Sequence, residues 1–577
     1  MALIDKASLL MVPSTYEAGK LYNVLPSGNR APDSTDQNSG YDQTRADFDF
    51  DRGSNTAATR VNSDGLIEKY RENTAEHSNT FNQWSNKTRI SFTSGQEDKD
   101  GGTDAWLAEC TADGQSYFYD TPTTNTGIRT RSVYAKAGTA SSITFLWDSF
   151  NQNEFATFNL ISGTFTNAGC LADMEDVGNG WYRCITTITD ASNTYAMLLS
   201  LSGKTGNSVT DGDNVYIMYA QQEAGLIATD YLSSTDVTGK AGVLVDLPRI
   251  NYDANGENGS LLLEPSRQQL FQFSEYFGDS SWTKSSGVVI TDNASISPEG
   301  LKNAYRIQIP SASGNSLMAQ LVAHTSGVKM TISAYMKSNT GNDESFQLFG
   351  DYGTPTGKSG TLTATSEWKR FTFTFTPTAT GDRNAGLINV ANTAADILVY
   401  GFQAESNATY ASSYIPNHGT SGGVTRAADS CSVTGVSDVI GQTEGTMFVE
   451  AETLENGADC RITISDNTIN NRVSIEWDAN ADTIKGFIGV GGNLATTSYD
   501  QTNRNKIAIV YNSTDARLFI NGTKVITDTS VPSLSGMDRI EFANFGAAVN
   551  TFFGKVYKMY VSEEKLTDAE AITLTTL

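Results

Sequence analysis

Two halves of this 577-residue chain carry the same short sequence patterns in the same order. The matching landmarks, first copy before second, are 132–136 (SVYAK) and 333–337 (SAYMK), 181–184 (WYRC) and 368–371 (WKRF), 219–223 (YAQQE) and 401–405 (GFQAE), and 231–232 (YL) and 414–415 (YI). Because ordered landmarks rarely arise by chance, the sequence predicts one domain type used twice. Repetition of a domain favours a binding scaffold over an enzyme, since one catalytic pocket seldom needs two copies of the domain that carries it.

The period of apolar residues indicates strands rather than helices. Apolar and polar residues alternate in 143–147, in 184–189 and in 369–376, as expected of strands that bury one face. Only 38% of the residues are hydrophobic and 51 are glycines, which is typical of short strands joined by polar turns. The predicted fold class is therefore all-β, built around tandem β-sandwiches.

Composition divides the chain into five regions. The first contains few apolar side chains, so it is predicted to be an extended arm without a core, which becomes ordered only against another chain. The last contains successive strand patterns and an Asn-Gly hairpin turn, which predict a third all-β unit. The predicted regions are the arm 1–70, the first sandwich 71–235, a connector 236–265, the second sandwich 266–428 and the third unit 429–577.

Charge and cysteine usage limit the compartment and the partners. The formal net charge of −25 disfavours binding to nucleic acid, whose phosphates would be repelled. The sequence shows no signal-peptide pattern and no apolar run long enough for a membrane helix. The five cysteines are widely spaced without a CxxC pair, which predicts free thiols formed in a reducing cytoplasm, with a Cys170–Cys184 disulfide as the alternative.

No catalytic motif is recognisable. The three histidines, His77, His324 and His418, lie far apart, and no zinc spacing, nucleophile elbow or phosphate-binding loop is present. Glu450 and Glu452 lie two residues apart on one predicted strand face, and they are the nearest approach to the carboxylate pair of a glycosidase. A solvated sheet face is the alternative reading of this pair. The chain is therefore predicted to have no catalytic centre.

The third unit resembles the laminin-G-like (concanavalin-type) jelly roll, through the hairpin 517–525 (RLFINGTKV) and the late strand 553–561. The two repeated sandwiches resemble carbohydrate-binding jelly rolls found in phage structural proteins. Connecting stretches are similar to those of phage tail-fibre and virion-appendage proteins: 48–53 with 58–68, 248–252 with 260–267, and 413–416 with 425–429. Since the first two stretches often sit close together in such proteins, the first sandwich is expected to be an insertion.

The resemblance implies a non-enzymatic fibre, spike or capsid decoration protein on the surface of a bacteriophage virion, synthesised in the host cytoplasm. Its implied partners are other virion proteins, contacted by the arm, further copies of itself in a homotrimer, and host surface glycans. One alternative is a purely structural capsid or tail component without a ligand. Another is a polysaccharide depolymerase or its binding portion.

Sugar binding requires exposed aromatic rings beside polar side chains. The candidate residues are Trp106, Tyr117, Tyr119, Trp147 and Tyr352, with core packing as the alternative for each. Trp181 and Trp368 recur inside predicted strands and are assigned to the core.

Glu223 and Glu405 recur at matching positions, each two residues after a glutamine. Since sandwiches of this kind often hold a structural calcium near the end of such a strand, the two glutamates are candidate calcium ligands. A repeated hydrogen-bonding cap is the alternative.

Overall fold

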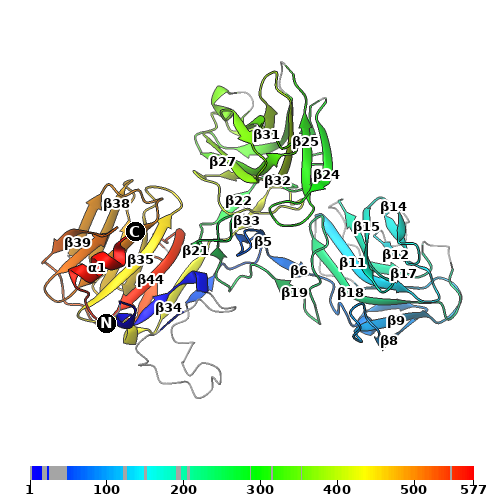
Figure 1. Ribbon diagram of the computed structural model, residues 1–577, viewed down its shortest axis with the longest axis horizontal. Coiled ribbons are helices and arrows are strands. Elements are labelled where there is room, and N and C mark those ends of the chain that lie inside the picture. Colours follow the sequence, from blue (N-terminus) through cyan, green and yellow to red (C-terminus); the bar gives the residue numbers. More distant parts are fainter. Residues whose placement is uncertain are drawn as a thin grey trace. The chain divides into compact units, whose positions relative to one another are not determined.

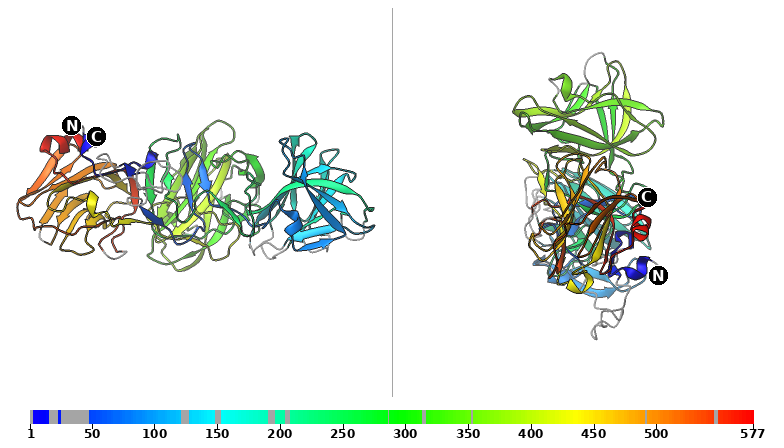
Figure 2. Two further views of the ribbon diagram at one scale, coloured as in Figure 1. Left: turned by 90° about the horizontal axis from the view of Figure 1, so that it is seen from below. Right: turned by 90° about the vertical axis from the view of Figure 1, so that its left-hand side faces the viewer.

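The computed structural model of the chain describes residues 3–15, 23–24, 48–120, 127–147, 153–189, 196–203, 208–285, 287–312, 316–351, 354–490, 492–545 and 549–577. Within these ranges the fold is all-β, as the sequence predicts, and strands in antiparallel ladders make up nearly every element (Figures 1 and 2). The helices are α1 (Asp568–Thr575) and the short 3₁₀ turns Leu3–Lys6, Pro13–Thr15, Phe81–Gln83, Pro355–Gly357 and Ser437–Val439. The described residues contain no helix that is both long and apolar enough to cross a membrane.

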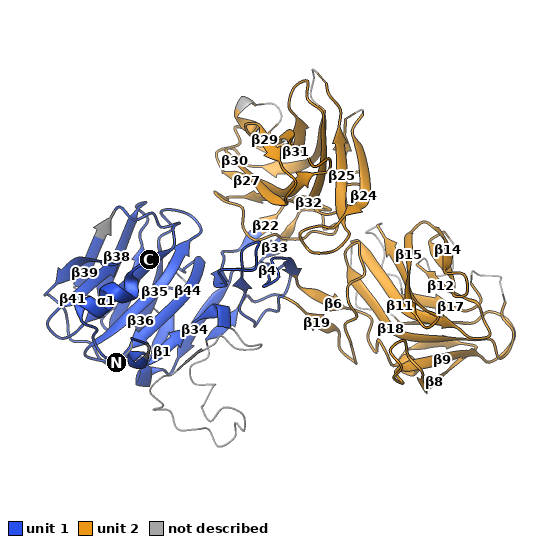
Figure 3. Ribbon diagram, viewed as in Figure 1, with its two compact units in different colours: residues 1–68, 243–267, 425–577 blue, residues 69–242, 268–424 orange. Residues whose placement is uncertain are grey.

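The chain divides into two compact units, and the first is assembled from three separate segments, 1–68, 243–267 and 425–577 (Figure 3). Two sheets enclose one hydrophobic core in this unit. The larger sheet contains, in order, β2 (Asn23–Val24), β1 (Leu9–Met11), β44 (Gly554–Ser562), β35 (Gly445–Thr453), β40 (Asn505–Tyr511), β41 (Ala516–Ile520) and β42 (Thr523–Asp528). In addition, β21 (Ser260–Leu263) pairs with β44, and β20 (Ile250–Asn251) pairs with β21. The smaller sheet contains β3 (Asp49–Asp51), β34 (Ser430–Thr434), β43 (Arg539–Glu541), β36 (Cys460–Ser465), β37 (Arg472–Trp477), β38 (Thr483–Ile488) and β39 (Gly492–Thr497).

The N-terminal segment contributes strands to this unit. β1 pairs with β44, and β3 pairs with β34, so the short apolar patterns near the start of the chain find hydrogen-bond partners in its last third. Leu9, Met11 and Phe50 are buried in the core that the C-terminal strands form. The prediction that this segment is ordered only against another chain is therefore wrong for these strands. Strands of three residues are too short to reveal a distant partner in the same chain.

The first sandwich lies in the second unit, which comprises 69–242 and 268–424. One of its sheets contains, in order, β14 (Thr164–Ala168), β13 (Phe155–Asn159), β12 (Ser142–Leu146), β17 (Met197–Ser200), β10 (Tyr117–Asp120) and β7 (Asn86–Thr88). The other contains β15 (Leu171–Gly178), β16 (Trp181–Ile188), β11 (Arg129–Ala137), β18 (Asn214–Ala224), β9 (Ala105–Cys110) and β8 (Ile90–Gln96).

The second sandwich has the same strand order. One sheet contains β29 (Leu362–Ala364), β28 (Glu344–Phe349), β31 (Gly381–Asn389), β26 (Leu317–His324) and β23 (Thr283–Lys284), and the other β30 (Lys369–Phe375), β27 (Met330–Ser338), β32 (Ala395–Ser406), β25 (Ala304–Ile309) and β24 (Val289–Ser295). Each of these strands has a counterpart with the same neighbours in the first sandwich. The first sandwich adds two consecutive strands, β14 at the edge of one sheet and β15 at the edge of the other, which account for its longer spacing between the lysine and tryptophan landmarks. The prediction of one domain type used twice is confirmed.

Both sandwiches are insertions into the first unit. The chain leaves for the first sandwich and returns through the paired strands β6 (Arg71–Asn73) and β19 (Gly239–Ala241). It leaves for the second and returns through β22 (Arg267–Gln269) and β33 (Val424–Arg426). The remaining pair, β4 (Thr59–Val61) with β5 (Ile67–Lys69), precedes the first departure. The sequence predicts the first insertion and misses the second.

A buried ionic network joins the three segments of the first unit. The guanidinium of Arg249 binds Glu264 at 2.7 Å and also Asp429, Arg426 binds Glu264 at 2.9 Å, and Arg52 lies 3.7 Å from Asp429. Burial, partly offset by Asp429 and reinforced by the other two guanidiniums, lowers the pKa of Arg52 to about 10. Removing one member of such a network leaves a buried charge without a partner, which is strongly destabilising. The network therefore fixes how the three segments meet. Its residues lie in the connecting stretches 48–53, 248–252, 260–267 and 425–429.

The five cysteines are buried and free, which confirms the prediction of unpaired thiols over a Cys170–Cys184 disulfide.

Candidate functional site

The two sandwiches share a buried polar scaffold around the glutamine landmark. In each copy the glutamine carboxamide accepts an N–H from the residue after the closing tyrosine, and the strand arginine donates to a carbonyl of the same loop. Equivalent contacts, first copy before second, are Gln221 with Leu232 N and Gln403 with Ile415 N (2.7 Å each), Arg183 with Thr229 O (2.5 Å) and Arg370 with Ser412 O (2.6 Å), Thr130 with Thr187 and Thr331 with Thr374 (2.8 Å each), and Ser78 with Tyr231 (2.6 Å) and Ser274 with Tyr414 (2.7 Å). The landmarks therefore recur because they hold this loop.

The candidate calcium ligands belong to the same scaffold. Glu223 accepts hydrogen bonds from the hydroxyl (2.6 Å) and the N–H (2.9 Å) of Thr229, and Glu405 accepts them from the hydroxyl (2.5 Å) and the N–H (3.1 Å) of Ser412. Burial raises the pKa of Glu223, although these hydrogen bonds oppose the shift. Across the described ranges no group of three or more His, Cys, Asp or Glu side chains is arranged to hold a metal ion. These contacts favour the hydrogen-bonding cap, and calcium binding stays a prediction.

Trp147 does not form a sugar-binding platform. Its side chain is fully buried, its indole N–H donates to the Thr186 hydroxyl at 3.0 Å, and the Arg131 guanidinium lies 3.6 Å from its ring centroid. The ring therefore packs inside the first sandwich, and the expectation of an exposed Trp147 is wrong. An alternating pattern identifies the two faces of a strand, but it does not tell which one is covered.

The other predicted aromatic residues differ in their surroundings. Trp106 packs against the same core and donates its indole N–H to the Asn79 carbonyl at 2.9 Å. Tyr117 and Tyr119 are partly exposed on β10, with ring centroids 6.5 Å apart. Tyr352 lies outside the described residues. A sugar-binding role for Tyr117 and Tyr119 stays a prediction.

We use the term outer face for the side of the β11 or β27 sheet that points away from the sandwich core. In the first sandwich this face is closed by the protein itself. Trp181 is fully buried there among Tyr134, Val177, Tyr216 and Tyr219, and Val177 belongs to the additional strand β15.

The β8–β9 loop also covers the outer face of the first sandwich. Lys99 lies 5.8 Å from the Tyr134 ring, and Asp104 accepts the Tyr219 hydroxyl at 2.9 Å. The carboxylate of Asp98 accepts three N–H groups of the loop, from Asp100, Gly102 and Asp104. Although burial opposes the shift, these backbone donors lower the pKa of Asp98, so the carboxylate holds the loop in its ionised form. The covering loop is thus anchored from within.

The outer face of the second sandwich is accessible at its β30 edge, whereas Leu398 and Tyr400 on the same face are buried. Among the described residues no strand corresponds to β15, and Trp368, which occupies the position of Trp181, is only partly buried beside β30. The Lys337 ammonium lies 5.5 Å from the Trp368 ring centroid, and the indole N–H donates to the Ile296 carbonyl at 3.2 Å. Beside them the Arg370 guanidinium lies 5.3 Å from the Tyr335 ring. The assignment of Trp368 to the core is therefore wrong, since without an equivalent of β15 its ring remains partly exposed on the outer face.

The far end of this outer face is polar and hollow. Arg306 binds Asp396 through two hydrogen bonds of 2.8 and 2.6 Å, and Glu344 accepts the Asp396 backbone N–H. Direct bonds from Arg306 lower the pKa of Asp396, which therefore remains ionised in weak acid. A cavity of about 410 Å³ opens here, bordered by Val289, Gln308, Pro310, Glu344 and Asp396 among others. Aromatic rings and fixed polar groups thus lie on one sheet face.

Glu450 and Glu452 are each engaged by a basic side chain in the first unit. Arg504 binds Glu450 and Lys555 binds Glu452, both at 2.7 Å, and Lys506 lies 4.0 Å from Glu450. This pairing favours the reading of a charged sheet face over an acid–base pair.

No family model and no curated protein matches the chain. Among solved structures it is similar to the CBM40 of the Ruminococcus gnavus IT-sialidase bound to α2,3-sialyllactose, with 16% identity, 23% of this chain and 83% of that chain covered, and a TM-score of 0.21. It is similar to the CBM22-1–CBM22-2 tandem of Paenibacillus barcinonensis Xyn10C (11% identity, 62% and 99% covered, TM-score 0.21). It is also similar to domains LG4-5 of the mouse laminin α1 chain (9%, 50% and 96%, TM-score 0.17). Scores this low carry no argument about what the present chain binds.

Proposed function

We propose that the chain binds glycans through the outer face of its second sandwich. The observation that carries the proposal is the partly exposed indole of Trp368, at a position where the first sandwich buries its tryptophan completely. An aromatic ring offers a flat apolar surface to the C–H face of a sugar, and neighbouring charged groups bind its hydroxyls. Lys337, Arg306 and Asp396 supply such groups across the same sheet face.

We further propose that this binding serves a non-enzymatic appendage of a bacteriophage virion, exposed on the particle surface. The connecting stretches that resemble virion appendages support this role, and the net charge of −25 agrees with a partner other than nucleic acid. Assembly as a homotrimer would suit weak single sites, because several sites that engage one surface multiply their affinity. The N-terminal segment, including residues 16–22 and 25–47, which lie outside the described ranges, is the candidate for docking to other virion proteins.

The test is retention of the full chain on immobilised host surface polysaccharide. Trp368→Ala should reduce retention at least tenfold, while Phe165→Ala, which removes an exposed aromatic ring from the first sandwich, should leave it unchanged. Equal retention of the wild type and Trp368→Ala would contradict the proposed face. Absence of retention in the wild type would favour the purely structural alternative.

Sizing of the glycan after incubation tests the non-enzymatic part of the proposal. The expected result is a polymer of unchanged length. Shortening that disappears when Glu450 and Glu452 are both replaced by Gln would establish the depolymerase alternative.

A further inference from the structure

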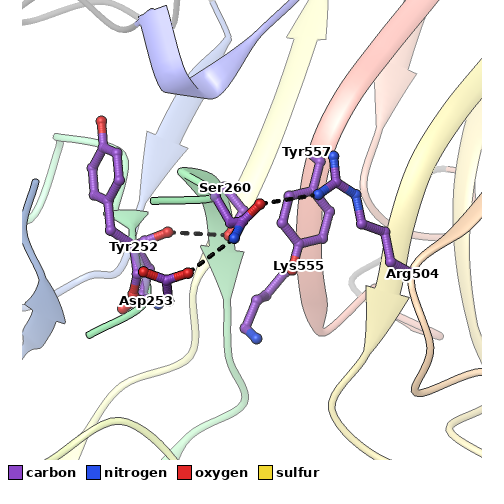
Figure 4. A pocket seen from close by; sticks show the side chains of 8 residues that line it. Tyr252, Asp253, Ser260, Arg504, Lys555 and Tyr557 are labelled. Carbon is purple, nitrogen blue, oxygen red and sulfur yellow. Dashed lines mark hydrogen bonds between the residues drawn. The ribbon is translucent and has the colours of Figure 1, made fainter. Parts of the chain in front are cut away.

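A second pocket lies wholly within the first unit, away from the residues of the proposed glycan face. It has a volume of about 290 Å³ and lies between the connector turn that follows β20 and the exposed side of β44. Its lining residues are Asn251, Tyr252, Asp253, Asn258, Ser260, Arg504, Lys555 and Tyr557 (Figure 4). The cavity lies at the lower limit of the volumes typical of small-molecule sites, so it suits a ligand of about one sugar ring.

The connector turn that forms one wall is held rigidly. Tyr252 N–H donates to the Val61 carbonyl at 3.0 Å, and Asp253 accepts N–H groups from Asn255 and Glu257, both at 2.9 Å. A Cβ atom on Gly256, whose φ is +73°, would lie 2.1 Å from the Ser63 carbonyl oxygen. The turn therefore presents its polar side chains in a fixed arrangement, which lowers the entropy cost of binding.

The opposite wall is equally fixed. The Arg504 guanidinium lies 4.0 Å from the Tyr557 ring centroid and donates to Glu450 at 2.7 Å. Its Nη1 reaches across to the Asn258 carboxamide oxygen at 3.4 Å, and the Asn258 amide donates to Asp253 at 2.9 Å. Figure 4 shows these contacts bridging the connector and the β44 side of the pocket.

Each charged group in and behind the pocket already has a partner. Glu450 neutralises Arg504, Glu452 neutralises Lys555, and the Asp253 carboxylate is held by the Asn258 amide and two backbone N–H groups. A charged ligand would have to displace one of these partners. A neutral ligand with several hydroxyl groups could instead accept from Arg504 and Lys555 and donate to Asp253 and Asn258 without leaving a charge unpaired.

We propose that this pocket binds one neutral sugar residue, at a site separate from the second sandwich. Asp253 and Asn258 accept hydroxyl protons from the connector side, and Arg504 and Lys555 donate from the sheet side. The site therefore selects against sugar acids such as glucuronate, whose carboxylate would either face the Asp253 carboxylate or have to displace Glu450 or Glu452 from its basic partner.

The test uses the full chain and saturation-transfer NMR with D-glucose, D-galactose, N-acetyl-D-glucosamine and D-glucuronate as probes. At least one neutral sugar should give a signal, and glucuronate should give a weaker one or none. Asn258→Gly tolerates the left-handed φ of 56° at this position, removes the carboxamide, and should weaken binding at least tenfold. Arg504→Lys keeps the charge opposite Glu450 but loses the planar fork, and it should weaken binding by a similar factor.

Two controls separate this site from the proposed function. Asn255→Gly alters the same turn at a residue that does not line the pocket, and it should bind like the wild type. Trp368→Ala should also leave the neutral-sugar signal unchanged. Loss of the signal in Trp368→Ala, or equal binding by Asn258→Gly and the wild type, would overturn the inference without affecting the glycan face. Preferential binding of glucuronate would overturn the assignment to neutral sugars.

Discussion

The first and second sandwiches share a buried polar scaffold but differ at the tryptophan edge of the outer face. The glutamine, arginine and tyrosine landmarks make the same hydrogen bonds at nearly the same distances in both. At the tryptophan edge, β15 and the anchored β8–β9 loop cover Trp181 in the first sandwich, whereas Trp368 in the second is only partly buried. The comparison shows that one scaffold can be kept by its buried polar contacts while one additional strand decides whether the edge of its sheet is accessible.

The two tryptophans give the largest expected difference. Trp181→Ala should destabilise the first sandwich by about 3–5 kcal/mol, because it removes a fully buried ring, whereas Trp368→Ala should cost the second sandwich less than about 1 kcal/mol. Amide hydrogen exchange of β16 and β30 in the full chain measures both effects separately. Similar losses of protection in the two strands would show that the outer faces are not different.

The landmark glutamines should behave alike. Gln221→Ala removes the acceptor of the partly buried Leu232 N–H, and Gln403→Ala removes that of the buried Ile415 N–H. Each should destabilise its own sandwich by about 1–3 kcal/mol. Exchange of the amides in β18 and β32 tests this equivalence. A large effect in only one sandwich would break the claim of a common scaffold.

A smaller difference is expected at the bulge beside the closing tyrosine. Gly401 has a φ of +64°, and an added Cβ would lie 3.0 Å from the Tyr414 ring, so Gly401→Ala should cost about 1–2 kcal/mol. The first sandwich has Tyr219 in the same conformation, stacked on Tyr231 with centroids 4.3 Å apart. Tyr219→Gly relieves the backbone but loses the stacking, so its net effect should stay within about 1 kcal/mol. Thermal unfolding of the two variants tests this order, and a greater loss for Tyr219→Gly would reverse it.

A pH dependence is expected at His418, whose carbonyl accepts the Ile128 N–H of the first sandwich. Burial lowers the pKa of His418, with Glu275 opposing and Lys69 reinforcing the shift. The histidine of the unfolded chain therefore binds a proton more readily than His418 of the folded chain. The free energy of unfolding is highest above the ordinary histidine pKa of about 6.5, and it falls as the pH drops toward the lower pKa of the folded state, by at most about 1.4 kcal/mol per pH unit.

Thr235 occupies the equivalent position in the first sandwich, so His418→Thr introduces the residue found there. In this variant the loss of stability between pH 7 and pH 5, measured by amide hydrogen exchange of β32, should be smaller than in the wild type. Amide exchange of β37, which belongs to the first unit, serves as the internal reference. An unchanged slope in the variant would assign the pH dependence to another group.

The repeat is readable from sequence because its landmarks are buried polar residues whose hydrogen-bond partners restrict substitution. Gln221 and Gln403 are examples, since each must satisfy the same loop. The exposure of aromatic residues cannot be predicted from the sequence. Alternation of apolar and polar residues identifies the two faces of a strand, but elements distant in the sequence decide which face is covered. Trp147 is therefore misassigned to the surface and Trp368 to the core. The pocket beside β44 is missed because Asp253 and Arg504 are far apart in sequence and meet only when the segments assemble.

The two insertions have a consequence for the order in which the protein folds. Ser8 hydrogen-bonds to Val561, a sequence separation of 553 residues, so the first unit cannot close until almost all of the chain has been synthesised. Each sandwich is one continuous stretch and can fold as soon as it leaves the ribosome. Once folded, each brings its two neck strands together, β6 with β19 and β22 with β33, and so shortens the loop that the remaining segments must close. The folded sandwiches thereby hold the ends of the neighbouring segments together. We expect the first unit to be the last part of the newly synthesised chain to become resistant to protease.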